Sequence, residues 1–357
     1  MTITQEMSAI ERFHTIDFLR GIAIIGVIGV HCSLTIPTEF PLITTLFSLG
    51  AYGVQLFFLI SAITMCLMWE KRAGEQHPIR NFYIRRLFRI APLFWLAIPL
   101  YLSINGIVSS HWAPDGIGES QIVLTALFLH GFYPDAINSV VPGGWSIAVE
   151  MTFYFLFPML ILSFKNNAKL YLCTAIVIWC INNLILKKWF TLLLTNDAHF
   201  STELISDFLN LYFISQAPVF LMGCWLYFSL ARKISRSALV ILMAWIAIAV
   251  LLKLLFSVSG LGFLLIFLFL TILTRASLLK SIAFKPLEYL GRNSYAIYLV
   301  HFLVISFVIR FLPNSSGIFS LFTALILTIV ISYLASYFIN LLIEKPFQKL
   351  AIKITNI

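Results

Sequence analysis

The chain has 357 residues, of which 60% are hydrophobic and 11% charged, and its formal net charge is +9 at pH 7. A soluble domain carries about 25% charged residues, so this composition excludes an ordinary soluble protein. Apolar runs of 18 or more residues recur along the sequence, which is typical of membrane-spanning helices. We therefore predict an all-α, polytopic membrane protein in which residues 1–357 form a single membrane domain.

Ten apolar runs are long enough to be spans. In chain order they are 20–37, 50–69, 87–104, 145–164, 170–187, 206–229, 237–256, 261–275, 289–310 and 318–342. A shorter run near 121–133 favours an interfacial or re-entrant segment, because a spanning helix needs about 20 residues.

The basic residues orient these spans. With the amino terminus inside, 20 of the 24 Lys and Arg residues fall on the inner side, and the exceptions are Lys187, Lys188, Lys253 and Arg310. Cytoplasmic loops carry such an excess. We predict ten spans with both termini cytoplasmic, so the positive charge reflects topology and no nucleic-acid partner is expected.

The first span carries polar residues in an otherwise apolar run, at Asp17, Arg20 and His31. Asp17 and Arg20 are three residues apart and therefore neighbours on a helix. His31 follows Arg20 by eleven residues, which is about three turns and roughly 16 Å along the axis. One polar stripe is thus predicted from the cytoplasmic mouth to mid-membrane. The alternative is an interfacial salt bridge with a snorkelling arginine and a histidine used in packing.

Three arginines, Arg85, Arg86 and Arg89, open the third span at its cytoplasmic end. Either Arg85 or Arg86 can pair with Arg89 on one helix face. Paired guanidinium groups bind phosphate well, so an anionic cytosolic ligand is predicted. An ordinary positive-inside anchor is the alternative.

A carboxylate lies inside the fourth span. Pro142, Gly143 and Gly144 precede the interfacial Trp145, and Glu150 follows with Tyr154 one turn further on. A buried carboxylate needs a partner, and because this helix has no Lys or Arg, we expect the partner on another helix. Ionisable residues inside a membrane usually serve function. Lining an outer cavity without chemistry is the alternative.

Another histidine, His301, falls near mid-depth of the ninth span, with Tyr298 one turn before it. A single histidine of this kind is more often structural, so it is a secondary candidate.

These elements, taken in order, resemble the acyltransferase-3 family of membrane-bound acyltransferases. The resemblance covers about residues 12–346. The first helix of the family reads D-x-L-R-G followed by a histidine, which matches Asp17, Leu19, Arg20, Gly21 and His31; the second reads F-F-x-x-S-G, which matches Phe57, Phe58 and Ser61, with Ala62 in place of the glycine. An arginine pair opens the third helix and matches Arg86 and Arg89, before Pro92. The later patterns are W-S-x-x-x-E-x-x-F-Y (Trp145, Ser146, Glu150, Phe153, Tyr154), S-Y-x-x-Y-L-x-H (Ser294, Tyr295, Tyr298, Leu299, His301) and E-K-P (Glu344, Lys345, Pro346).

The resemblance implies transfer of an acyl group, usually acetyl, from a cytosolic acyl-coenzyme A such as acetyl-CoA to a hydroxyl. The expected acceptor is a cell-surface or exported glycan, or a lipid-linked saccharide such as lipopolysaccharide, at the bacterial inner membrane. Some relatives carry an extra carboxy-terminal hydrolase-like domain, which is not expected here because the sequence ends at Ile357.

The same resemblance implies roles for the residues singled out above. His31 removes the acceptor proton or carries the acyl group, and Glu150 orients it or the acceptor. Arg20, Arg86 and Arg89 hold the coenzyme phosphates. Supporting or substrate-binding roles fall to Asp17, Ser61, Trp145, Tyr154, Tyr298 and His301.

The main rival function is a transporter or flippase, because intramembrane His, Asp, Glu and Arg also form substrate pathways. A non-catalytic scaffold leaves the polar stripe unexplained. His130 and Asp135 in "HGFYPD" have the H-x4-D spacing of glycerolipid acyltransferases, but nothing else from that family accompanies them. None of the five cysteines has a metal-ligand spacing, so neither a metal nor a disulfide is expected.

Overall fold

The computed structural model describes residues 3–196, 199–231, 285–312 and 316–355. These residues are helical apart from turns, short loops and one isolated β-bridge between Ser110 and Ala113, which confirms the all-α prediction for this part of the chain. The chain divides into two compact units. Unit 1 is Met1–Ile60 with Gly262–Pro346, and unit 2 is Ser61–Leu261 with Phe347–Ile357.

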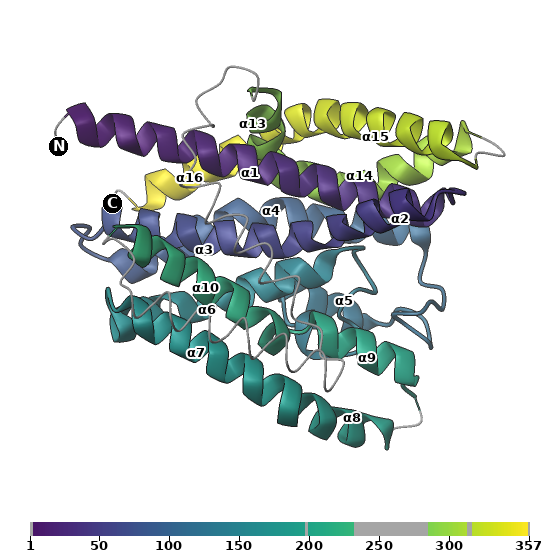
Figure 1. Ribbon diagram of the computed structural model, residues 1–357, viewed down its shortest axis with the longest axis horizontal. Helices are drawn as coiled ribbons and strands as arrows, with labels where there is room; N and C mark the ends of the chain where they lie inside the picture. The colour runs from purple at the N-terminus through teal and green to yellow at the C-terminus, as the bar shows by residue number, and fades with distance from the viewer. Residues whose placement is uncertain (1–2, 197–198, 232–284, 313–315, 356–357) are drawn as a thin grey trace. The chain divides into compact units, whose positions relative to one another are not determined.

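Unit 1 is built on one long helix, α1 (Ile3–Thr35), which ends two residues before Pro37. Its other elements are α2 (Pro41–Ser48), η1 (Leu49–Tyr52), the first part of α3 (Gly53–Lys71), α13 (Lys285–Arg292), α14 (Ser294–Arg310), α15 (Ile318–Ile339) and η6 (Asn340–Glu344). Helices α13, α14 and α15 all pack against α1 (Figure 1). The two ends of the sequence therefore build this unit together.

Glycines allow α1 and α13 to approach closely. A Cβ atom on Gly291 would overlap the carbonyl oxygen of Asp17, and one on Gly21 would overlap the carbonyl oxygen of Leu287. Small residues at membrane helix contacts permit such backbone approach. The contact brings Asp17 beside α13.

Unit 2 contains the remaining helices. They are the rest of α3, α4 (Pro78–Asn105), α5 (Glu119–Ala126), η2 (His130–Phe132), α6 (Gly144–Phe164), α7 (Ala168–Ile181), η3 (Asn182–Leu186), α8 (Lys187–Thr195), α9 (Thr202–Leu211), α10 (Phe213–Ala231) and most of α16 (Lys345–Thr355). Helix α10 packs along α7 and contacts α6, and α6 contacts α4 (Figure 1). Helix α6 thus has the arginine-bearing α4 as a neighbour.

Seven helical stretches among the described residues are long and apolar enough to cross a membrane: His14–Thr35, Pro41–Lys71, Pro78–Asn105, Gly144–Phe164, Ala168–Thr195, Thr202–Ser229 and Ile318–Thr355. The bent pair Lys285–Arg292 and Ser294–Arg310 adds an eighth if it is one span. The expected spans 237–256 and 261–275 lie outside the described residues. The count of ten and the sides of the termini therefore stay predictions.

Some helices differ from the expected spans. The ninth expected span, 289–310, is broken at Asn293, where α13 and α14 meet at 83°. The π-helical segments η3 and η6 continue helices that were expected to end near 187 and 342. A π-bulge inserts extra residues without stopping a helix, and apolar periodicity does not reveal it. The segment near 121–133 forms only α5 and η2, which are too short to span.

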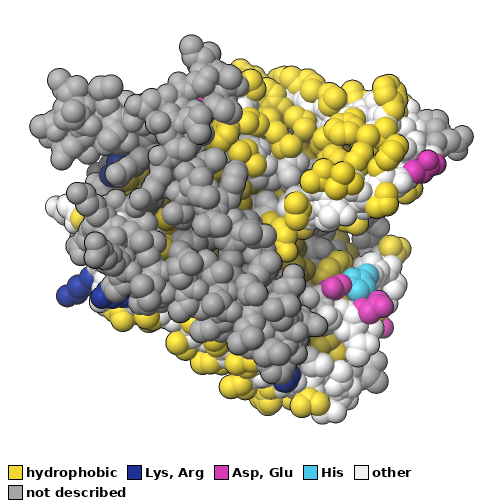
Figure 2. All heavy atoms as spheres, viewed as in Figure 1, with side chains coloured by type: hydrophobic (Ala, Val, Ile, Leu, Met, Phe, Trp, Pro, Cys, Tyr) yellow, Lys and Arg dark blue, Asp and Glu magenta, His cyan; other side chains and the backbone are white. Residues whose placement is uncertain are grey.

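Hydrophobic side chains cover the part of the surface where α15 lies (Figure 2). Phe319, Ile326, Val330 and Leu334 on this helix are all exposed. A large exposed apolar surface on a soluble protein would be a liability, whereas lipid solvates it.

Candidate functional site

Two histidines from distant parts of the sequence meet in unit 1. The ring centroids of His31 on α1 and His301 on α14 lie 5.4 Å apart. The Phe302 ring contacts both, with centroid distances of 4.4 Å to His31 and 4.1 Å to His301. The packing of α14 on α1 therefore unites the primary and the secondary histidine candidates.

His301 is fully buried and has one of its ring nitrogens fixed by the backbone. Its Nδ1 lies 2.6 Å from the Tyr298 carbonyl oxygen. Because a carbonyl only accepts, Nδ1 carries the hydrogen, and Nε2 is the acceptor nitrogen of a neutral imidazole. Nε2 has no hydrogen-bond partner within the described part of the chain. An unpaired buried acceptor is costly, so it marks a place for a donor from a ligand or water.

Two aromatic side chains complete the surroundings of the histidine pair. The Tyr298 ring lies 5.6 Å from the His301 ring and packs edge-on against Phe57, at 6.3 Å. His31 is less enclosed than His301, being partly exposed. Of the two imidazoles, His31 is thus the more accessible.

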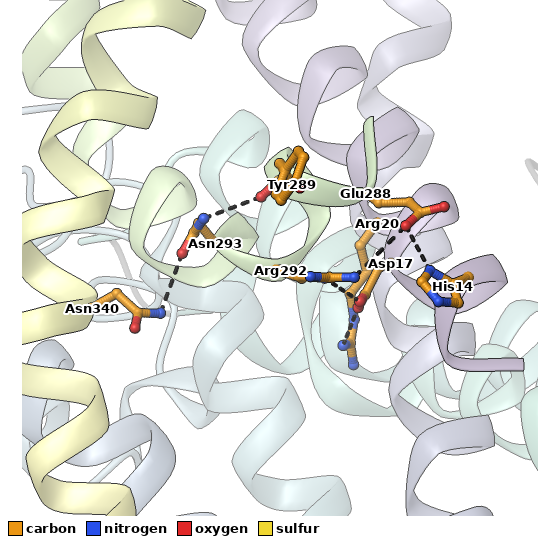
Figure 3. A network of polar contacts seen from close by, with 8 residues as sticks. All are labelled: His14, Asp17, Arg20, Glu288, Tyr289, Arg292, Asn293 and Asn340. Atoms are coloured by element: carbon orange, nitrogen blue, oxygen red, sulfur yellow. Dashed lines mark hydrogen bonds and ion pairs between the residues drawn. The ribbon is translucent and has the colours of Figure 1, made fainter. Parts of the chain in front are cut away.

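Asp17 and Arg20, at the start of the predicted polar stripe, belong to an ion-pair network between α1 and α13 (Figure 3). The Asp17 carboxylate accepts a hydrogen bond from Arg292 Nε at 3.1 Å and lies 3.9 Å from Arg20 Nη1. Glu288 pairs with His14 Nδ1 at 2.7 Å and with Arg292 Nη2 at 3.7 Å. The network anchors α13 on α1, which gives Asp17 a structural role.

The same network extends to the end of α15 (Figure 3). Asn293, at the bend between α13 and α14, donates to the Tyr289 carbonyl oxygen at 3.1 Å. Asn340 donates to Asn293 Oδ1 at 3.2 Å. No sequence pattern singles out Glu288, Arg292 and Asn293, because their partners on other helices are 47 to 275 positions away.

In unit 2, Glu150 has its hydrogen-bond partners on two helices. Ser61 on α3 donates to Glu150 Oε1 at 2.5 Å, and the Tyr154 hydroxyl, one turn further along α6, donates to the same oxygen. The Ser61 and Tyr154 hydroxyl oxygens are 3.1 Å apart. The expected partner from another helix is therefore Ser61, an uncharged hydroxyl, and Tyr154 of the same helix joins it.

Arg86 approaches this carboxylate cluster from α4. It is almost fully buried, and its Cζ lies 5.6 Å from the centre of the Tyr154 ring and 5.9 Å from that of Phe82. Such cation–π contacts hold a guanidinium over an aromatic face. Arg85 instead pairs with Glu75 at 2.5 Å. Of the two arginines that the spacing allowed, Arg86 is therefore the one that lies over Tyr154, a hydrogen-bond partner of Glu150.

The same end of α4 borders a pocket of about 50 Å³. Its lining is made of three arginines and apolar or aromatic side chains: Met68, Trp69, Arg72, Pro78, Phe82, Arg85 and Arg86. These residues form the arginine pocket. They have the chemistry for an anionic cofactor with an aromatic ring, because guanidinium groups bind phosphate and the aromatic rings stack on a base.

Trp145 is positioned by the turn that starts α6. Gly143 has a positive φ of 76°, and its backbone N–H donates to Asn138 Oδ1 at 2.8 Å. Trp145 packs against a buried cluster that includes Ile137 and Phe208. Its position thus supports the start of α6.

His130 and Asp135, the H-x4-D pair, are engaged in structural contacts. His130 is buried and stacks on Phe94, and its Nε2 lies 3.0 Å from the Gly144 carbonyl oxygen. Since a carbonyl only accepts, His130 is the donor. Asp135 accepts from Gln121 at 2.7 Å. The described residues also contain no group of three or more His, Cys, Asp or Glu that could hold a metal ion.

Known proteins resemble this chain over most of its length. The family model described as an acyltransferase domain, of the acyltransferase-3 type, matches residues 13–337. The peptidoglycan O-acetyltransferase OatA of Listeria monocytogenes is 27% identical over 82% of this chain and 49% of its own length. A putative O-acetyltransferase of Staphylococcus aureus strain COL is 25% identical over 96% of this chain and 58% of its own length. This chain spans about half the length of the curated relatives it matches, and no solved structure matches it.

Proposed function

This chain belongs to the acyltransferase-3 family, and from that premise we propose that it is a membrane O-acetyltransferase. It moves an acetyl group from cytosolic acetyl-CoA to a hydroxyl of a cell-surface or exported glycan. The two relatives described above are named as O-acetyltransferases, one of them as putative, and the other is named for peptidoglycan.

The observation that carries the proposal is the pair of His31 and His301, because acyl transfer to a hydroxyl needs a proton acceptor. His31 is the general base in this scheme. His301 is a positioning residue, fixed through Nδ1 by the Tyr298 carbonyl and lying 5.4 Å from the His31 ring.

The reaction exchanges one bond for another. The acceptor oxygen attacks the thioester carbonyl carbon while His31 takes the hydroxyl proton. The C–O bond forms, the C–S bond breaks, and the imidazolium returns the proton to the departing thiolate. The products are the acetyl ester and free coenzyme A thiol, and no oxidant, reductant or metal enters the balance.

The donor is held, in this proposal, by Arg86 and Arg89, with Arg20 as a further cation. Arg86 lines the arginine pocket, and it also lies over Tyr154, which hydrogen-bonds Glu150. Charge-assisted bonds from arginine to phosphate are strong and directional. Glu150, held by Ser61 and Tyr154, orients the acceptor or the catalytic histidine.

The proposed topology follows from the charge distribution. With ten spans and both termini cytoplasmic, in the inner membrane of a bacterium, the basic start of α4 faces the donor in the cytosol. The loop 105–119 then faces outward, as does the part of the predicted outer segment 189–204 that follows α8, for example at His199 and Ser201. Single cysteines introduced there should react with an impermeant thiol reagent added outside, and reaction only from the cytosol would overturn the topology.

The activity is tested by mass spectrometry of surface glycans from cells with and without the protein. Acetylation predicts a glycan that carries the mass of an acetyl group only when the wild-type protein is present. A parallel assay follows free thiol released from acetyl-CoA by purified protein in lipid nanodiscs with acceptor. A transporter or flippase would move its substrate unaltered and release no thiol.

A further inference from the structure

One acidic side chain lies among the arginines between α3 and α4. Glu75 belongs to the short loop 72–77, and its carboxylate faces three donors. Arg85 Nη2 lies 2.5 Å from Oε2, Asn81 Nδ2 lies 3.0 Å from the same oxygen, and Arg72 Nη1 lies 3.5 Å from Oε1. The carboxylate therefore occupies the centre of a small anion-binding arrangement.

The local sequence explains this convergence. Pro78 opens α4, and Asn81 and Arg85 are four residues apart, so they share one face of its first turns. Arg72 directly follows α3. The loop between them is short enough to hold Glu75 over the start of α4, where the helix dipole also favours a negative charge. Three donors from two helix ends thus face one oxygen pair.

The ionisation of Glu75 agrees with this geometry. Burial raises the pKa of its carboxyl group, but the hydrogen bonds from Arg85 and Asn81 and the two nearby cations outweigh burial and lower that pKa below its ordinary value. Glu75 is therefore an anion at neutral pH.

Two of the arginines that Glu75 engages also line the arginine pocket. Arg72 and Arg85 contribute to it beside Arg86, Trp69 and Phe82. The pocket of about 50 Å³ has room for several water molecules, since one water needs about 10–15 Å³. An anion entering it competes with Glu75 for the same guanidinium groups.

We propose that Glu75 is an internal competitor of the acyl donor, holding Arg72 and Arg85 until a phosphate group of coenzyme A displaces it. This inference rests on the proposed function, because it assumes a coenzyme A donor. A phosphate group near neutral pH carries a charge of about −1.5 to −2 and three acceptor oxygens, so it outcompetes a single carboxylate. The Glu75 side chain is already 28% exposed, so a displaced carboxylate needs only a small movement to become fully hydrated.

Such a competitor has two effects. It lowers donor affinity, because part of the binding free energy is used to release the arginines. It also keeps an ion pair on Arg72 and Arg85 when the pocket is empty, so that the guanidinium groups keep their orientation. Removing the charge of Glu75 should thus tighten donor binding.

The test measures coenzyme A binding to purified full-length protein in nanodiscs by isothermal titration. Glu75→Gln should lower the dissociation constant about tenfold, which is the size expected for one hydrogen bond between charged groups. Glu75→Asp keeps the charge on a shorter side chain and should give an intermediate value. Glu119→Gln makes the same charge change at an exposed position on α5 outside the pocket, and should leave binding unchanged.

Three further variants separate this inference from the proposed function. Arg85→Ala should weaken binding, and adding Glu75→Gln to it should give little of the tenfold gain, because Glu75 then has lost its main partner. If Arg86→Ala weakens binding while Glu75→Gln binds no tighter than wild type, the donor site stands and the competitor is overturned. If wild-type protein binds no coenzyme A, both the proposed function and this inference are overturned.

Discussion

The histidine pair of unit 1 and the Glu150 cluster of unit 2 are both polar groups within apolar helices, yet their bonding differs. Glu150 Oε1 accepts from Ser61 and Tyr154, whereas His301 Nε2 has no partner within the described residues. A carboxylate that is hydrogen-bonded by the protein is held in one orientation. An imidazole with an open nitrogen is ready to exchange a proton. Under the proposed function, this difference in bonding corresponds to two roles, which are proton transfer for the histidine pair and orientation for Glu150.

The largest expected effect comes from the histidine pair. His31→Ala should lower the turnover number about a hundred- to ten-thousandfold, which is the usual contribution of a general base. The measurement is thiol release by purified, correctly inserted protein at saturating donor and acceptor. Donor binding should remain.

The turnover of His301→Ala is compared with that of His31→Ala. Because His301 acts through His31 in the proposed scheme, its loss should lower turnover less, and His301→Gln should recover part of the activity by replacing the ring with another hydrogen-bonding side chain. Near-normal turnover of His31→Ala would show that this residue serves helix packing. The proposed difference in role between the histidine pair and the Glu150 cluster would then be wrong.

The arginines should produce the next largest effect, and on a different kinetic constant. Replacing both Arg86 and Arg89 with Ala should raise the Michaelis constant for acetyl-CoA tenfold or more, since each charge-assisted bond contributes about 1.5–3 kcal/mol. The constant for the acceptor should change little. Arg80→Ala, an exposed arginine on the first turns of the same helix, is the matched control. An unchanged donor constant in the double variant would leave these arginines as topological anchors.

A smaller effect is expected from the carboxylate cluster. Glu150→Gln keeps an acceptor for Ser61 and Tyr154 but removes the charge, and should lower turnover roughly tenfold, or about 1.4 kcal/mol. Tyr154→Phe removes one donor and should cost less. Turnover of Glu150→Gln equal to wild type would show that orientation, and not charge, is what this residue contributes.

The smallest functional effect should come from the glycine contact, which acts on stability. Gly291→Ala would place a Cβ against the Asp17 carbonyl oxygen, and such overpacking costs about 1–3 kcal/mol. The melting temperature of the purified protein should fall. Gly74→Ala, where a Cβ meets nothing within 4 Å, is the control, and equal melting temperatures for the two variants would contradict the close packing of α13 on α1.

Much of the fold could be read from hydrophobic runs. The expected spans 87–104 and 145–164 lie within helices of the structure, and 20–37 does so up to Thr35, where α1 ends. The reason is that twenty apolar residues in lipid can satisfy their backbone only as helix. The bend at Asn293 was not predicted. The bend depends on the contacts of Asn293 with Tyr289 and Asn340. None of these three residues belongs to a motif that marks a helix break in the sequence.

The candidate site, like the fold, was predictable from the sequence only in part. The spacing of Asp17, Arg20 and His31 on one helix was predictable, since α1 is continuous from Ile3 to Thr35. That Asp17 pairs with Arg292, 275 positions away, was not. By helix spacing alone, Arg85 and Arg86 were equal candidates, and the family pattern favoured Arg86. The fold adds their different partners, Glu75 for Arg85 and the Tyr154 ring for Arg86.

Local sequence is enough to predict that this protein is helical and membrane-embedded, and which polar side chains lie within its apolar helices. Those properties depend on local composition and on the 3.6-residue period, which one helix expresses without its neighbours. Only the tertiary structure decided the partners: His301 beside His31, Ser61 on Glu150, and Glu75 on the arginines. Partners on different helices are set by packing between segments far apart in the chain, and no local period encodes that choice.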